Sequence, residues 1–149
     1  MVSTTAGSIH GSAVIVQHAG ILVRGPSGSG KSALCHGLIQ TAHLAGDYCA
    51  WIADDRLLLS DNGHRLIARP VPEVAGLAEH RHLGVVPVNH VEAAVIDIIV
   101  DLSEVQNLER PGEFSFQTTP IEVRAPQRCM AISVPMVLEL IERLRSGHV

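Results

Sequence analysis

The chain has 149 residues, of which 46% are hydrophobic, and this is enough for one compact domain with a substantial core. Only 3% of the residues are aromatic, so the core must be built from Val, Ile, Leu and Ala. The net charge of −4 argues against a basic nucleic-acid-binding surface. We expect a single domain over residues 1–149 and no nucleic-acid partner.

The sequence shows no targeting signal and no cysteine pairing, and we therefore expect a cytoplasmic protein. The N-terminus lacks a basic region followed by an apolar stretch, so no signal peptide is expected. The longest apolar runs, such as 93–96, are soon followed by aspartates, and we therefore expect no membrane span. The three cysteines, Cys35, Cys49 and Cys129, are far apart and form no C-x-x-C pair. This spacing favours reduced thiols over a disulfide framework or a zinc ribbon.

The first elements in chain order are two short strands and a helix. Residues 12–17 and 21–24 are rich in β-forming residues, and the three residues 18–20 between them predict a hairpin. A glycine-rich stretch follows. Apolar residues then recur at helical spacing over 31–44, with Gly46 as the stop signal.

The middle of the chain predicts a second hairpin. Residues 49–59 are typical of a strand that an acidic pair interrupts, and 60–63 (SDNG) has the composition of a hairpin turn. The return strand is expected over 64–68. Pro70 and Pro72 then predict irregular chain.

The last third begins with its strongest strand, predicted over 93–102. Residues 107–119 are rich in Pro, Gly and polar residues and predict a loop. Short strands are expected over 121–123 and 130–133, and an amphipathic helix with a proline in its first turn over 134–145. Because hairpins bracket the glycine-rich stretch, the pattern indicates an α/β fold with a mixed central sheet and flanking helices rather than strict βαβ alternation.

The glycine-rich stretch GPSGSGKS carries the clearest functional signal. It fits G-x-x-x-x-G-K-[ST], the pattern of a loop that wraps nucleotide phosphates, and it lies between a predicted strand and a predicted helix. Backbone N–H groups and the helix N-terminus would bind phosphate, Lys31 would neutralise its charge, and the Ser32 hydroxyl could bind Mg²⁺. The nucleotide-binding candidates are Gly25, Pro26, Ser27, Gly28, Ser29, Gly30, Lys31 and Ser32.

Hydrolysis or transfer of a phosphate also needs a carboxylate and a further cation. Asp54 and Asp55 are the first carboxylate candidates, and in a strand they would face opposite sides, which leaves open which one faces the phosphate. Glu79 and Arg81 would share a face in an extended segment and could supply a metal ligand and a cation. Arg110 lies in the predicted loop, from which a cation could approach a transferring phosphate. Each of these patterns also occurs on solvated surfaces.

Together, these motifs resemble a known family. His10-Gly11, GPSGSGKS, IADDRL, EHRHLGVV, ERPG and PIEVRAPQR occur in the order found in HPr kinase/phosphorylase. The resemblance covers nearly the whole chain and corresponds to the family's C-terminal catalytic domain alone, as in shortened versions that lack the N-terminal domain. It implies a P-loop kinase domain that uses ATP to phosphorylate a serine of HPr, the phosphocarrier of the bacterial sugar phosphotransferase system. The family also removes that phosphate with inorganic phosphate and so forms pyrophosphate.

The resemblance also implies roles for individual residues. It assigns catalytic roles to His10, Lys31, Asp55 and Arg110, and Mg²⁺ binding to Ser32 and Glu79. Asp55, rather than Asp54, would take the serine proton. The implied cofactors are ATP and Mg²⁺, the implied partner is HPr or a related phosphocarrier, and the family's hexamers imply a homo-oligomer.

Some positions depart from the family pattern. His82 replaces a glycine of the E-x-R-G-L-G motif, and 126–128 differs from the P-G-R-N segment that the family links to dephosphorylation. These changes are compatible with kinase activity, and they leave open whether the chain also has phosphorylase activity. The alternative from another class is a regulator that binds ATP with little or no transfer. A small-molecule kinase is less favoured, because no arginine-rich lid segment is present among the 11 Lys and Arg residues.

Overall fold

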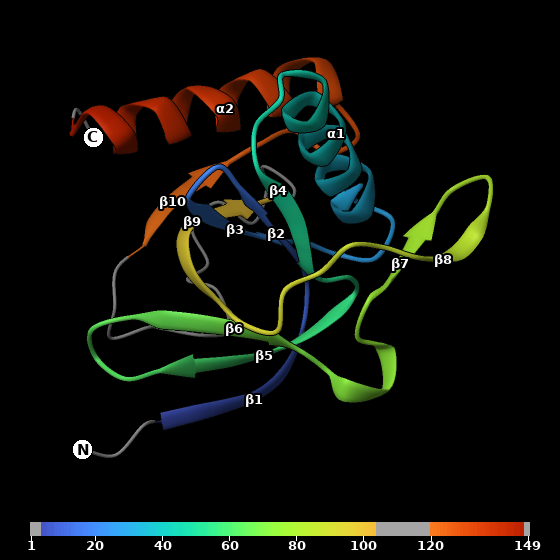
Figure 1. Ribbon diagram of the computed structural model, residues 1–149, viewed down its shortest axis with the longest axis vertical. Coiled ribbons are helices and arrows are strands. Elements are labelled where there is room, and N and C mark those ends of the chain that lie inside the picture. The colour runs from blue at the N-terminus through green and yellow to red at the C-terminus, as the bar shows by residue number, and fades with distance from the viewer. Residues whose placement is uncertain (1–3, 104–119, 148–149) are drawn as a thin grey trace.

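The computed structural model describes residues 4–103 and 120–147, which form an eight-stranded mixed sheet, a small two-stranded sheet and two α-helices (Figure 1). The strands of the large sheet are β1 Thr4–His10, β2 Ser12–Val16, β3 Ala19–Arg24, β4 Cys49–Ala53, β5 Arg56–Asp61, β6 Leu66–Pro70, β9 Ala94–Asp101 and β10 Ile121–Arg124. The small sheet pairs β7 Leu77–His80 with β8 Gly84–Pro87, after a short 3₁₀ helix over Pro72–Val74. The helices are α1 Lys31–Leu44 and α2 Met130–Ser146.

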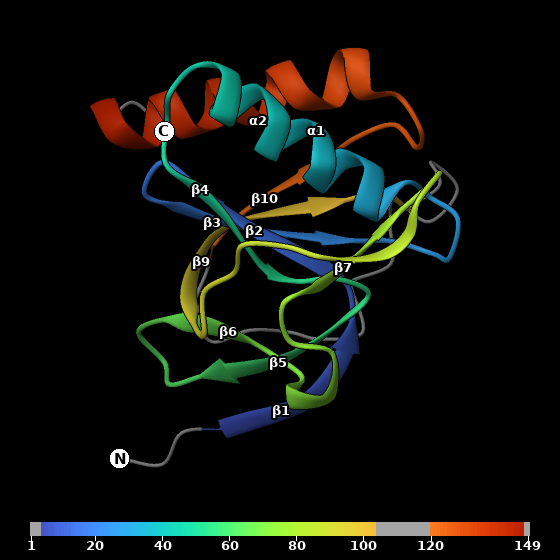
Figure 2. The same cartoon turned by 45° about the vertical axis from the view of Figure 1, so that its right-hand side comes forward.

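The strand order of the large sheet is β1-β5-β6-β9-β3-β2-β4, with β10 also paired to β9. Strand β9 is parallel to β3 and to β10, whereas its first residues pair antiparallel with β6. This strand therefore bends from a lower layer of β1, β5 and β6 into an upper layer that contains β10, β3, β2 and β4 (Figure 2). The predicted α/β fold with a mixed sheet is confirmed.

Two hydrophobic clusters lie on opposite faces of the upper layer. Ile21 and Val23 of β3 belong to the cluster under the helices, and Leu22 belongs to the cluster against the lower layer. All three side chains are fully buried. An unbroken apolar run is what a strand covered on both faces requires, and burial contributes about 1.5–3 kcal/mol for each large aliphatic side chain.

Both helices cover one face of the upper strand layer, and the lower strand layer covers its other face (Figure 2). α1 and α2 approach closely at Gly37, where a Cβ would lie 3.0 Å from Cγ2 of Val134. The glycine that weakens α1 in isolation thus makes room for its neighbour. Within the described residues, no helix is long and apolar enough to cross a membrane.

Several predicted elements are confirmed. The first hairpin is β2 and β3, the helix over 31–44 is α1, the second hairpin is β5 and β6, and the strand over 93–102 is β9. The short strand over 121–123 is β10. The strand over 49–59 is instead two strands, β4 and β5, which lie at different places in the sheet order.

The strand predicted over 130–133 is wrong, because α2 already begins at Met130. The backbone carbonyl of Cys129 accepts the N–H groups of Ile132 and Ser133, and these bonds close the first helical turn. Ile132 is the one β-branched residue of this segment, and it is exposed, whereas Met130 packs against the hydrophobic cluster that contains α1. Pro135 consequently lies inside the helix and not in its first turn.

Three strands had no clear sequence signal. β1 is an edge strand with few apolar residues, and β7 and β8 form a short hairpin whose side chains are mostly exposed. None of these three strands shows the alternation of apolar and polar residues that is typical of a half-buried strand. The predicted loop over 107–119, with Arg110, lies outside the described residues.

Candidate active site

The glycine-rich loop, residues 25–30, runs from the end of β3 into the first turn of α1 (Figure 2). Gly30 caps the helix with φ of 100°, a conformation that side chains rarely adopt. Lys31 is the only lysine of the chain, and its side chain is almost fully buried. Its ammonium group donates hydrogen bonds to the carbonyls of Gly25, at 3.0 Å, and Pro26, at 3.1 Å. The positive charge therefore lies across the interior of the loop.

A second cation contacts this loop from the other end of the chain. The backbone N–H of Arg128 donates to the carbonyl of Ser29 at 3.1 Å, and its Nε donates to the carbonyl of Gly28 at 2.7 Å. Arg128 has a positive φ of 53°. Sequence reasoning gave Arg128 no role in the site, because no spacing rule connects residues 100 positions apart.

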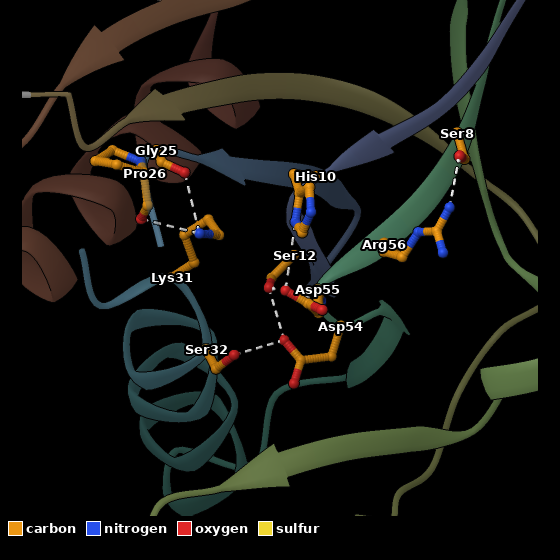
Figure 3. Close-up of polar contacts among 10 residues, drawn as sticks. All are labelled: Ser8, His10, Ser12, Gly25, Pro26, Lys31, Ser32, Asp54, Asp55 and Arg56. Carbon is orange, nitrogen blue, oxygen red and sulfur yellow. Dashed lines mark hydrogen bonds and ion pairs between the residues drawn. The ribbon is translucent and has the colours of Figure 1, made fainter. Parts of the chain in front are cut away.

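Asp54 is the carboxylate that faces the loop helix (Figure 3). It is 7% exposed, and its Oδ1 accepts hydrogen bonds from the hydroxyls of Ser12, at 2.6 Å, and Ser32, at 2.7 Å. Its Oδ2 accepts the backbone N–H of Glu79 at 2.7 Å. Ser32 thus gives its proton to Asp54 and keeps lone pairs free for a cation.

The charge of Asp54 also acts on the helix beneath it. Cys35 of α1 is fully buried, and burial raises the pKa of its thiol well above the usual value. The negative charge of Asp54 raises this pKa further. Cys35 is therefore a neutral, structural thiol under the site.

Asp55 faces away from the loop helix and lies beside His10, the last residue of β1. Its Oδ1 is 3.5 Å from Nδ1 of His10, and the two side chains are 65% and 73% exposed. Asp55 has a positive φ of 68° and lies in a bend between β4 and β5. This bend, and not the alternation of a strand, sends the two carboxylates in different directions.

The remaining predicted residues are only partly in the site. The backbone N–H of Glu79 donates to Asp54, although Glu79 as a whole is exposed to solvent. Arg81 lies in the turn between β7 and β8, so the shared face expected for Glu79 and Arg81 is wrong. Arg110, which lies in 104–119, is outside the described residues.

The donor set of the site fits a nucleotide phosphate with Mg²⁺. Within residues 4–103 and 120–147, no three His, Cys, Asp or Glu side chains are grouped to hold a metal by themselves. Mg²⁺ rarely needs such a cage, because it takes one or two protein oxygens together with phosphates and water. Ser32 and Asp54 offer oxygens of this kind. In the same described ranges, the buried Oγ of Ser29 has no hydrogen-bond partner, which leaves a polar atom free within the loop.

Fold and site together define a mixed α/β domain in which a glycine-rich loop leads from a buried strand into a helix, beside a buried carboxylate. The chain belongs to the HPr serine kinase C-terminal domain family, whose model matches residues 3–141.

Known proteins of the same kind resemble the chain in sequence and in fold. It is 30% identical to the HPr kinase/phosphorylase of Lactobacillus acidophilus over 90% of this chain and 43% of the relative. It is 31% identical to that of Treponema pallidum strain Nichols over 93% of this chain and 47% of the relative. The chain thus spans less than half the length of these curated relatives. The solved HPr(Ser) kinase/phosphatase from Coxiella burnetii has a similar fold, with a TM-score of 0.73, 16% identity, and coverage of 95% of this chain and 98% of that one.

Proposed function

We propose that this chain is the catalytic domain of an ATP- and Mg²⁺-dependent protein-serine kinase that acts on HPr or a related phosphocarrier. The observation that carries the proposal is the division of the acidic pair. Asp54 is buried and hydrogen-bonded to Ser32 at the start of α1, whereas Asp55 is open to solvent beside His10. One carboxylate is therefore suited to a metal and the other to a protein substrate. The names of the relatives support HPr as the substrate.

The reaction needs a base on the solvent side. The serine oxygen of the substrate forms a bond to the γ-phosphorus of ATP, the bond from this phosphorus to the β,γ-bridging oxygen breaks, and ADP leaves. The hydroxyl proton of the serine passes to the carboxylate of Asp55, which is exposed and can be reached by a protein surface. Asp54 is unsuited to this step, because its oxygens already accept three hydrogen bonds in a buried position.

The other residues bind and orient. N–H groups of the glycine-rich loop and the ammonium group of Lys31 hold the phosphates, and Ser32 with Asp54 holds Mg²⁺. When bound, Mg²⁺ neutralises phosphate charge and fixes the orientation of the phosphate oxygens. The roles of Glu79 in metal binding and of Arg110 as a cation on the transferring phosphate come from the family resemblance and are part of this proposal.

The reverse reaction is proposed at the same site. Inorganic phosphate would attack the phosphorus of phosphoserine, the phosphorus–oxygen bond to serine would break, and Asp55 would return the proton to the serine oxygen. The products are pyrophosphate and the free serine. Release of pyrophosphate from phosphorylated HPr tests this half directly.

The kinase proposal is tested by incubating the protein with ATP, Mg²⁺ and the cognate HPr and measuring phosphoserine by mass spectrometry. The wild type should form phosphoserine, and Asp55→Asn should not. Asp47→Asn is the matched control, because Asp47 is exposed between α1 and β4, away from the site, where its carboxylate accepts a hydrogen bond from Gln17. Wild-type turnover by Asp55→Asn would rule out the assigned proton transfer.

A second outcome of this assay would distinguish the kinase from the alternative function, a nucleotide-sensing regulator. ATP binding at micromolar concentration without transfer to HPr or a related phosphocarrier would favour a nucleotide-sensing regulator. The homo-oligomer implied by the family is tested by light scattering of the same sample, with and without nucleotide.

A further inference from the structure

Ser12, the first residue of β2, connects the carboxylate of Asp54 to the backbone of Asp55 (Figure 3). It is fully buried. Its hydroxyl donates to Oδ1 of Asp54 at 2.6 Å and accepts the backbone N–H of Asp55 at 3.2 Å. A serine hydroxyl has one proton to donate and lone pairs to accept, so Ser12 uses both capacities on neighbouring aspartates. Nothing in the glycine-rich loop pattern or in the assigned roles includes this residue.

The backbone of Asp55 needs such support because its conformation is strained. The N–H of Arg56 donates to the carbonyl of Asp54 at 2.8 Å, so Asp55 is the centre of a three-residue turn with φ of 68°. Turns of this kind with positive φ are rare, and a non-glycine residue in the left-handed region persists only when its surroundings hold it there.

The segment Gly11–Ser12 supplies that support at both ends of the residue. The N–H of Gly11 donates to the carbonyl of Asp55 at 3.0 Å, while the Ser12 hydroxyl accepts the N–H of Asp55. His10 immediately precedes this segment, and its ring faces the Asp55 carboxylate. One short stretch of chain therefore carries the histidine and also fixes the backbone from which its partner carboxylate projects.

The same hydroxyl also fixes the orientation of Asp54. Oδ1 of Asp54 is shared between Ser12 and Ser32, and Oδ2 accepts the N–H of Glu79. Without Ser12, Oδ1 of Asp54 would lose one of its two donors and would be held by the Ser32 hydroxyl alone. A shift of this oxygen would alter the bond to Ser32, the residue at the start of α1 on which metal binding is proposed.

We infer that Ser12 is a positioning residue that sets the metal-side carboxylate and the solvent-side carboxylate relative to each other through one buried hydroxyl. This role rests on the proposed kinase function. Ser12 is fully buried and its hydroxyl contacts the two aspartates rather than the glycine-rich loop, so its loss should lower the rate of transfer and leave nucleotide binding intact.

Steady-state kinetics of three variants tests the inference. In Ser12→Ala, kcat should fall on the order of 10–100-fold, because small displacements of catalytic groups cost this much. The KM for ATP and the Kd for ADP should stay within about threefold of wild type. Ser12→Thr keeps the hydroxyl and should recover most of kcat. Ser133→Ala is the matched control, because Ser133 is an equally buried serine whose hydroxyl contacts Pro126 instead.

Amide hydrogen exchange tests the geometry independently of any transfer. The Asp55 amide should exchange about tenfold faster in Ser12→Ala and at the wild-type rate in Ser133→Ala. A kcat within threefold of wild type in Ser12→Ala, or an unchanged exchange rate at Asp55, would overturn the positioning role. A wild-type protein that transfers no phosphate, but shows the exchange difference, would refute the proposed function and leave the structural role of Ser12 in place.

Discussion

The two halves of the site are built in different ways. The glycine-rich loop and Lys31 are contiguous in sequence, and all the local contacts of the lysine are made within six residues. The carboxylate half is assembled from three distant segments, which contribute His10 to Ser12, Asp54 with Asp55, and the backbone of Glu79. The loop half offers backbone groups and the cations of Lys31 and Arg128, whereas the carboxylate half depends on side chains that fix one another.

This difference predicts how the halves fail. The loop half should lose nucleotide affinity when the cation of Lys31 is removed, with little effect on the rest of the fold. A corner made of mutually hydrogen-bonded side chains should lose geometry and stability together when an internal member is changed. Mutations in the loop half should therefore change mainly nucleotide affinity, whereas mutations in the carboxylate half should change the transfer rate and the stability of the fold.

The largest expected effect is on the acidic pair. Asp55→Asn should lower kcat about 10³-fold with little change in Tm, because the base is lost but asparagine tolerates positive φ. Asp54→Asn should also destabilise the fold by about 1–3 kcal/mol, since an amide nitrogen would meet groups that donate to both carboxylate oxygens. Urea unfolding and transfer assays on both variants measure the contrast. Equal stability losses in the two variants would contradict the division of roles.

The next effect concerns the lysine of the loop. Lys31→Ala should weaken ATP binding on the order of 100-fold, because the charge within the loop is lost. Thermal stability should change much less than in Asp54→Asn. Isothermal titration calorimetry measures the affinity. Because Lys31 is the only lysine, an amine-reactive ATP analogue should label this side chain alone, apart from the N-terminus, and ATP should protect it. Labelling that ATP does not reduce would argue against a nucleotide in the loop.

A smaller effect should separate the two contacts of Arg128 with the loop. Arg128→Gly keeps the backbone bond to Ser29, relieves the positive φ and removes the side-chain bond to Gly28. ATP affinity should fall about 3–10-fold, as expected for one hydrogen bond. Arg128→Lys keeps the charge but not the Nε donor. Similar losses in both variants would assign the effect to the bond, and a loss in glycine alone would assign it to charge.

These contrasts also explain what could be predicted from the sequence. The loop half was predictable because its signal is local: a strand, glycines at fixed spacing, and a helix whose bounds 31–44 match α1. The β2–β3 hairpin and β9 were predictable for the same reason, since periodicity and turn residues act over a few positions.

The carboxylate half was predictable only as a set of candidates. The pattern ADD marked the acidic pair, but the direction of each carboxylate is set by a positive φ at Asp55 and by donors from β2 and β7. Ser12 gave no signal, and Arg128 stood only in a segment compared with the family pattern, without a link to the loop, because their partners lie 42 and 100 positions away. Likewise, the start of α2 was missed, because its first turns pack near Gly37 of α1, which is far from them in the sequence.

The smallest expected effect lies beneath both halves, at Cys35 of α1. Burial and the charge of Asp54 raise the pKa of its thiol in the folded state, so the neutral thiol favours folding. This contribution is complete below the pKa of the unfolded chain, about 8.5, and is lost as pH rises from there toward the folded pKa. The free energy of unfolding should therefore decrease above about pH 8.5, with a slope from this group of at most about 1.4 kcal/mol per pH unit.

Urea unfolding between pH 8 and pH 10.5 measures this slope in wild type and in Cys35→Ala. The variant should be less stable at pH 8, because the substitution leaves a buried cavity, but its stability should depend less on alkaline pH. Asp54→Asn should narrow the pH range of the loss, since one cause of the raised pKa is removed. The same alkaline slope in wild type and Cys35→Ala would mean that groups other than Cys35 control the loss of stability.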